Sequence, residues 1–211
     1  NRQVVLSKRI APFIMRRTKD QVATDLPPRT EIIETVQLTG PQRALYETVR
    51  STMHERVRKA LAQKGLASSK ITVLDALLKL RQACCDPQLV KLASAASITA
   101  SAKRSRLMEM LESLIAEGRR VLVFSQFVEM LRLIESDVKV RGWDYLMLTG
   151  QTQKRGELVE AFQSGKASLF LISLKAGGVG LNLTAADTVI LYDPWWNPAI
   201  ERQAMDRVHR I

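Results

Sequence analysis

The sequence predicts an α/β fold, in which a doubly wound parallel sheet occupies the second half of the chain and a mostly helical, basic segment precedes it. Two patterns carry this prediction. From about residue 105, short apolar runs alternate with amphipathic helical stretches, as expected for strands joined by crossover helices. Residues 1–100 instead show mainly helical spacing. The small, weakly patterned stretch 92–102 (LASAASITASA) predicts a linker, so we expect two domains, 1–100 and 101–211.

The first domain is expected to contain two helices. Apolar residues recur at helical spacing between residues 41 and 64, and again between residues 73 and 80. The segment LPPRTE (26–31) breaks any helix, because proline forces extended backbone on itself and on the residue before it. Partial alternation in EIIETVQL (31–38) predicts a short strand.

The second domain is expected to alternate helices with strands. Apolar stripes predict two helices that end at Gly118 and Gly142, and a third helix over residues 154–163. The predicted strands are VLVF (121–124), WDYLML (143–148), SLFLI (168–172) and TVILY (188–192). Strands joined by helices of this length form a parallel sheet that is covered on both faces, which is half of a doubly wound, nucleotide-binding type of fold.

Composition places the chain among soluble globular proteins. It has 211 residues, of which 46% are hydrophobic and 25% charged. No apolar run approaches the roughly 20 residues that span a bilayer, so we expect no membrane partner. The two cysteines, Cys84 and Cys85, are adjacent and lack the spacing of metal ligands, and only two histidines are present. We therefore expect no metal site and a reducing, intracellular compartment. Because Asn1 is not an initiator methionine, we expect the chain to be part of a longer protein.

The net charge points to a polyanionic partner. It is +11 overall, with a pI near 10.1. Residues 1–100 hold 17 Lys and Arg against 8 Asp and Glu, whereas residues 101–211 hold 15 against 13. The excess positive charge therefore lies in the first half, although a basic surface that serves only solubility stays open at this point.

Unusual residues gather in the loops that follow the four predicted strands. These loops contain SQF, TGQT, SLKAGGVGLNLT and DPWWNP. In a parallel sheet, ligands meet the loops at the carboxyl ends of the strands. Four such loops, each rich in Gly, Ser, Thr, Asn or Trp, predict a functional surface along one edge.

The glycine-rich loop KAGGVG (175–180) has two interpretations. Adjacent glycines let backbone N–H groups approach a phosphate, but the same residues also form tight structural turns. The loop is not a P-loop, because G-x-x-x-x-G-K-[ST] occurs nowhere and its lysine precedes the glycines. The dinucleotide-binding pattern G-x-G-x-x-G is missing as well. The sheet therefore lacks the parts that would by themselves hold ATP and its metal.

Four motifs, in their order and spacing, resemble the second helicase lobe of the Swi/Snf family of ATP-dependent DNA translocases. They are VLVFSQF, LTGQT, SLKAGGVGLNLTAADTVILYDPWWNP and QAMDRVHRI. Upstream, PFIMRRTKDQVATDLPPRTE, LTGPQRALYE and LLKLRQACCDPQLV are similar to the family's inter-lobe segment. One departure is Asp86, where the family often carries histidine before the proline. The resemblance covers nearly the whole chain and implies a RecA-like lobe that ends within its last motif, without the first lobe and its Walker lysine and magnesium-binding acids.

The resemblance also implies an ATP site shared between two lobes. The first lobe would bind ATP with Mg, while Gln203, Arg207 and Arg210 approach the phosphates from the second. Their spacing of four and then three residues places them on one helix face, and a guanidinium offers forked donors to developing charge. Arg207 and Arg210 would then be the catalytic residues.

Other residues belong to the same expected nucleotide site. Gly178 and Gly180 would line it, and Asp206 would orient an arginine rather than act as a base. The structural alternative is a helix whose arginines pair with Glu201, Asp206 or solvent.

The remaining loops are expected to face DNA. These loops offer hydroxyl, amide, backbone N–H and cationic groups. Such groups would contact the phosphates of DNA, and these contacts do not depend on the base sequence. The expected DNA-binding residues are Ser125, Gln126, Thr149, Gly150, Thr152, Arg155, Ser173, Lys175 and Trp195, with charge added by Lys154. Of the tryptophan pair, we expect Trp195 to touch DNA and Trp196 to pack under the sheet edge. Asn197 is expected to cap the helix that begins near Pro198, or else to bind a ligand.

The expected function is that of a second motor lobe in an ATP-dependent double-stranded-DNA translocase or remodeller. The chain alone is expected to be inactive. Its partners would be duplex DNA, the N-terminal helicase lobe of the same protein and a DNA-bound protein that is displaced. A non-catalytic basic DNA-binding module and an RNA helicase lobe are the alternatives. We expect a bacterial cytoplasm or nucleoid as the location, or the nucleus if the protein is eukaryotic.

Overall fold

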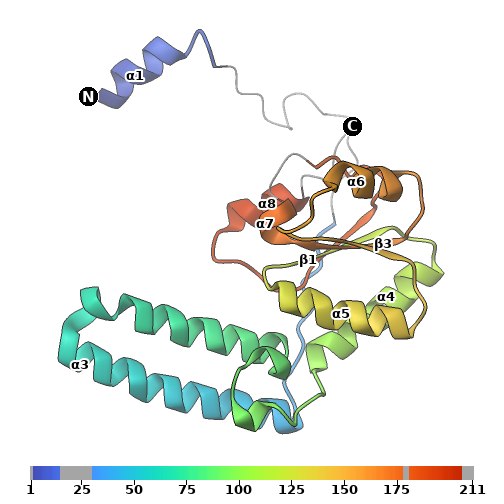
Figure 1. Ribbon diagram of the computed structural model, residues 1–211. Helices are drawn as coiled ribbons and strands as arrows, with labels where there is room; N and C mark the ends of the chain where they lie inside the picture. The colour runs from blue at the N-terminus through green and yellow to red at the C-terminus, as the bar shows by residue number, and fades with distance from the viewer. Residues whose placement is uncertain (1, 15–29, 178–180, 206–211) are drawn as a thin grey trace.

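A parallel sheet and a projecting helical hairpin dominate the computed structural model, which describes residues 2–14, 30–177 and 181–205 (Figure 1). The helices before the sheet are α1 (Arg2–Ile10), α3 (Gly40–Cys85) and two short 3₁₀ helices, η1 (Pro87–Leu89) and η2 (Ala93–Ala95). The second half contains α4 (Ala102–Ala116), β1 (Val121–Ser125), α5 (Val128–Val140), β2 (Tyr145–Leu148), α6 (Arg155–Gln163), β3 (Leu169–Ser173), α7 (Leu174–Gly177), β4 (Thr188–Leu191) and α8 (Pro198–Met205). The order of helices and strands predicted for the second half is confirmed.

The four strands form one parallel sheet in the order β2-β3-β1-β4. In its register Val121 lies opposite Leu169 on one side and opposite Thr188 on the other. All five residues of β1 and of β3 are buried, since these two strands lie at the centre and helices cover both faces. The predicted doubly wound α/β fold is therefore correct.

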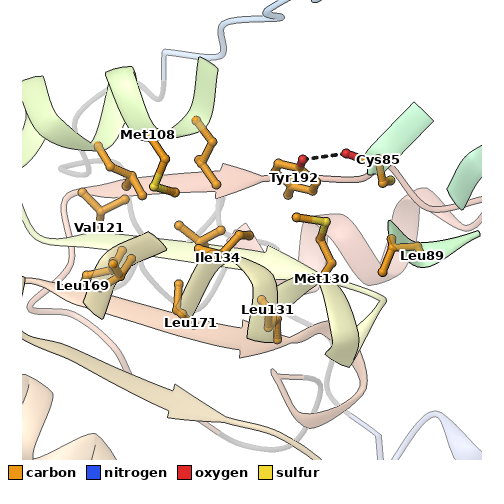
Figure 2. Packing of buried hydrophobic residues seen from close by; sticks show 14 residues of the cluster. Cys85, Leu89, Met108, Val121, Met130, Leu131, Ile134, Leu169, Leu171 and Tyr192 are labelled. Carbon is orange, nitrogen blue, oxygen red and sulfur yellow. Dashed lines mark hydrogen bonds between the residues drawn. The ribbon is translucent and has the colours of Figure 1, made fainter. Parts of the chain in front are cut away.

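Alternate residues of each strand enter two separate hydrophobic clusters. On one face Val121 and Val123 pack with α4, α5 and Tyr192, as Figure 2 shows for part of this cluster. On the other face Leu122 and Phe124 pack with residues of α6, α7 and the 181–186 segment. The period-2 direction of strand side chains produces this division, which makes the sheet the centre of two cores.

Helix α3 is a hairpin of two arms that bends at Gly65, where φ is +68°. Glycine adopts this left-handed conformation without the steric cost of a side chain. The arms are held together by an ion pair of Arg56 with Asp75 at 3.0 Å and by a hydrogen bond from the Ser69 hydroxyl to the carbonyl of Ala60 at 2.9 Å. The two predicted helices are thus confirmed, and Figure 1 shows the hairpin projecting away from the sheet.

One prediction about the first half is wrong. Residues 31–38 have no regular secondary structure, and Ile32 and Ile33 are exposed. A strand needs a neighbour to complete its hydrogen bonds, and partial alternation in the sequence does not supply one.

The stretch 92–102, which is the expected linker, connects the α3 hairpin and η1 to α4. It contains η2, and the buried Ala95 packs against the core of the α3 hairpin.

Candidate functional site

The carboxyl ends of all four strands meet at one edge of the sheet, because the strands are parallel. The ends of these strands and the segments that follow them contain all nine expected DNA-binding residues, from Ser125 to Trp195. The edge therefore gathers segments that lie up to about seventy residues apart in sequence, as doubly wound folds do. How each side chain is used within these loops decides which of them remain available to a ligand.

The loop after β1 is fastened to the segment after β4 by a buried carboxylate. Asp193 accepts a hydrogen bond from the backbone N–H of Gln126, with 3.1 Å between nitrogen and Oδ2. Burial raises the pKa of Asp193, although the hydrogen bonds from Ser125 and Gln126 oppose this rise. Gln126 itself is half-buried at the edge. Asp193 is not among the site residues predicted from the sequence. It is the first residue of the motif DPWWNP, in which only the tryptophans and Asn197 have predicted roles.

The two strand-terminal serines are not available for the direct phosphate contacts expected of them. Ser125 is fully buried, and its hydroxyl accepts from the backbone N–H of Phe127 at 3.1 Å. Ser173 is buried too, and its hydroxyl accepts from the N–H of Ala176 at 3.3 Å. Both hydroxyls are used to turn the chain as it leaves a strand, as serine commonly does.

The described part of the glycine-rich loop is a helical turn, α7. Lys175 is exposed on it, whereas Leu174, Ala176 and Gly177 are buried. A Cβ atom on Gly177 would lie 2.8 Å from Cε1 of Phe124, so the backbone packs too closely for any side chain. This supports the structural interpretation for the first glycine and leaves Lys175 facing outward. The expected nucleotide residues Gly178 and Gly180 lie outside the described residues.

The loop after β2 is organised by its two threonines. The Thr152 hydroxyl accepts from the N–H of Thr149 at 3.0 Å, and the Thr149 hydroxyl accepts from the N–H of Gln151 at 3.3 Å. Gly150 between them is exposed. Arg155, half-buried at the start of α6, donates through Nε to the Thr152 carbonyl at 3.3 Å. The loop thus has a fixed shape and presents backbone at its tip.

The packing of the two tryptophans is the reverse of the one expected. Trp195 is half-buried and packs against the second hydrophobic cluster, whereas Trp196 is 58% exposed. A DNA contact of Trp195 stays a prediction. Asn197 accepts a hydrogen bond from the N–H of Ala199 at 3.0 Å, which is the expected helix cap.

Helix α8 carries the start of the expected nucleotide-facing motif. Glu201 in its first turn accepts a hydrogen bond from the backbone N–H of Trp195 at 2.5 Å, which ties the helix to the tryptophan segment. Gln203 lies on this helix. Asp206, Arg207 and Arg210 lie outside the described residues, and their roles stay predictions.

Sequence reasoning also missed Arg81. This residue of α3 lies beside both tryptophans, with its guanidinium carbon 5.3 Å from the ring centroid of Trp195 and 4.8 Å from that of Trp196. Arg81 directly follows the apolar stripe of the predicted helix 73–80, which is a weak signal of such a contact, and 113 residues separate it from its hydrogen-bond partner, Pro194.

Within the described residues, no cluster of three or more His, Cys, Asp or Glu side chains is arranged to hold a metal ion. None of the described helices is long and apolar enough to cross a membrane.

Comparison with known proteins adds family information to this geometry. Residues 102–211 match the model of the helicase conserved C-terminal domain, and residues 1–89 match that of the SNF2-related domain. The chain is 36% identical over 210 residues to an uncharacterized ATP-dependent helicase of Mycoplasma pneumoniae, covering 98% of this chain and 20% of that protein. It is 37% identical to the human SWI/SNF-related matrix-associated actin-dependent regulator of chromatin subfamily A member 1, covering 96% of this chain and 20% of that protein. The chain thus spans about a fifth of the length of these relatives.

Solved structures agree with these matches. The Sulfolobus solfataricus SWI2/SNF2 ATPase core domain superposes with a TM-score of 0.72 at 31% identity, covering 99% of this chain and 44% of that one. The same core in complex with double-stranded DNA gives a TM-score of 0.72 at 33% identity, with the same coverage of both chains.

Proposed function

Given that the chain belongs to the Swi/Snf family of helicase-like ATPases and has its RecA-like C-terminal lobe, we propose that it is the second motor lobe of an ATP-dependent double-stranded-DNA translocase. In the complete enzyme, a first lobe would bind ATP with Mg. The second lobe, which this chain forms, would close on the first lobe and its bound ATP. Hydrolysis of ATP to ADP and phosphate would then be coupled to movement along duplex DNA and to displacement of a DNA-bound protein.

One observation carries the DNA half of the proposal. The segments after the four strands gather at one edge, and they include exposed Lys175, Lys154 and Gly150 and half-buried Gln126 and Arg155. Cations, an amide and backbone N–H groups are the usual ligands of DNA phosphates, and such contacts are independent of sequence. The net charge of +11 favours the same partner, and a related core has been solved with double-stranded DNA.

The nucleotide half rests on α8 and on the motif that continues it. Gln203 lies on α8, and Arg207 and Arg210 follow at helical spacing in the sequence. Arginine side chains suit the transition state of phosphoryl transfer, in which charge spreads over the transferred group. The donor set of the described residues offers no acidic cluster for Mg, so we assign Mg and most ground-state contacts with ATP to the first lobe. This lobe would contribute arginines that act mainly as the charge develops.

The experiment compares ATP hydrolysis by the 211-residue chain with hydrolysis by the complete enzyme, each with and without duplex DNA. We expect the chain alone to show no turnover above background, because it lacks the phosphate-binding lysine motif. The complete enzyme should be stimulated by double-stranded DNA. ATP hydrolysis by the isolated chain would contradict the proposed division of roles between the lobes. An unchanged rate of hydrolysis by the complete enzyme when duplex DNA is added would contradict the proposed DNA substrate.

A further inference from the structure

The last turns of the α3 hairpin contact the segment Tyr192–Trp196 at two points, one helical turn apart. Near one end of the segment, the hydroxyl of Tyr192 donates to the carbonyl of Cys85 at 2.9 Å, as the dashed line in Figure 2 shows. At the other end, the guanidinium of Arg81 donates to the carbonyl of Pro194 and lies over both tryptophan rings. The hairpin therefore holds both ends of the segment.

Arg81 combines two interactions that few other side chains can combine. Its planar guanidinium can contact an aromatic face while its N–H groups donate in the plane to a carbonyl. Arg81 itself is half-buried, and its hydrogen bond to Pro194 is exposed. A lysine at this position would keep the positive charge but lose the planar fork.

The segment that Arg81 holds is in turn tied to two functional loops. The N–H of Trp195 donates to Glu201 of α8 at 2.5 Å, and α8 carries Gln203. In the sequence, Arg207 follows this helix. The carboxylate of Asp193 accepts from the N–H of Gln126 in the loop after β1. A continuous series of contacts thus runs from the α3 hairpin through the tryptophan segment to both the expected DNA loop and the expected nucleotide helix.

We propose that Arg81 is a positioning residue for ATP hydrolysis: it clamps the tryptophan segment so that α8, which carries Gln203, is held in register with the DNA-facing loops. This inference rests on the proposed function and adds to it a role for the inter-lobe hairpin. Because catalytic groups that are displaced by about 1 Å can lose about 10²-fold in rate, loss of the clamp should lower turnover rather than ATP affinity.

The test measures DNA-stimulated ATP hydrolysis of the complete enzyme carrying Arg81→Ala, Arg81→Lys or the control Arg132→Ala. Arg132 lies on α5 with 56% of its side chain exposed and pairs only with its helix neighbour Glu129 among the described ion pairs. We expect Arg81→Ala to lower kcat by about 10²-fold with KM for ATP unchanged, and Arg81→Lys to restore little of this loss. Arg132→Ala should behave as the parent enzyme.

Thermal melts and tryptophan fluorescence of the 211-residue chain accompany the kinetics. Melts of the three variants should coincide, while the fluorescence emission of Arg81→Ala alone should shift, because two of the three tryptophans lose a cation from their rings. A kcat equal to that of Arg132→Ala would overturn the positioning role. The positioning role would also be overturned if Arg81→Ala lost activity and melted at a lower temperature than the other variants. Arg81 would then be needed for stability rather than for positioning.

The two proposals fail in different ways. If the parent enzyme shows no DNA-stimulated hydrolysis, the proposed function is wrong and the positioning role falls with it. If the parent enzyme is active but Arg81→Ala leaves both kcat and fluorescence unchanged, only the clamp is wrong.

Discussion

Removal of Arg104 should destabilise the junction between the α3 hairpin and the sheet domain more than removal of any exposed arginine. Arg104 on α4 lies 3.0 Å from Oδ2 of Asp86, through Nη1, and 3.1 Å from Oδ2 of Asp137 on α5, through Nε. Asp86 follows the hairpin, is 0% exposed and caps η1 by accepting from the N–H of Gln88 at 2.9 Å. One guanidinium thus joins three elements around a buried carboxylate.

The size of the effect follows from the burial of Asp86. Breaking a buried ion pair by removing one partner costs about 3–5 kcal/mol of unfolding free energy, because the remaining charge stays buried without compensation. Burial already raises the pKa of Asp86 above its usual range, and Arg104 only partly opposes this. Arg104→Met should therefore lower the free energy of unfolding by about 3–5 kcal/mol near neutral pH.

The sign of the pH dependence follows from the raised pKa of Asp86. A carboxyl whose pKa is higher in the folded than in the unfolded state binds protons more readily when folded, so its contribution to stability is present below its ordinary pKa and is lost as pH rises through its folded pKa. Arg104→Met should raise that folded pKa further. The difference in free energy of unfolding between the parent and this variant should therefore become smaller as the pH is lowered through the folded pKa of Asp86.

Urea unfolding followed by circular dichroism measures these differences. Arg106→Met is the matched control, because Arg106 lies on the same helix, is 44% exposed and pairs with Glu34 and Glu109. We expect the control to lose at most about 1 kcal/mol, as exposed pairs do. The double variant Arg104→Met/Asp86→Asn should recover most of the loss, since no buried charge remains. The reasoning is refuted if Arg104→Met is no less stable than the control, or if the double variant recovers nothing.

Two further predictions concern ligand binding and reactivity. Lys175→Ala should lower the slope of log affinity for duplex DNA against log salt by about 1, because one phosphate contact is lost, and an unchanged slope in a salt titration would remove Lys175 from the DNA-binding surface. The thiols of Cys84 and Cys85 should resist alkylation at neutral pH in the folded chain and react once it is unfolded. Burial raises the pKa of both thiols, that of Cys85 to about 12, and the thiolate is the reactive form. Rapid modification of Cys85 in the native chain would contradict this account.

The sheet domain could be predicted from the sequence because its signals are local. Continuous apolar runs such as 121–124 follow residues that end helices, such as Gly118. The predicted limits of the strands therefore lie within about two residues of the observed limits. The segment 31–38 failed for the opposite reason: whether a partly alternating stretch becomes a strand depends on a partner strand elsewhere in the fold.

The edge of the sheet could be predicted as a location, but not side chain by side chain. Whether Ser125 and Ser173 face inward depends on how the chain turns as it leaves each strand, and this is not visible in residue type. The order of exposure of Trp195 and Trp196 is likewise not visible in residue type, because it depends on the path of the chain between β4 and α8. Arg81 could not be found at all, because its partners lie more than a hundred residues away.

Turnover of the complete enzyme carrying Arg210→Ala tests most directly the claim that this chain is the second half of an ATP-driven motor. The account predicts that DNA-stimulated hydrolysis falls by about 10³–10⁵-fold, as for a lost arginine finger, while folding, duplex-DNA binding and ATP binding persist. Arg210→Lys should restore little, because an ammonium cannot reproduce the forked donors. A variant that keeps more than about a tenth of the parental turnover would contradict the role of Arg210 in the motor, and one that melts early and loses DNA binding would make this arginine structural.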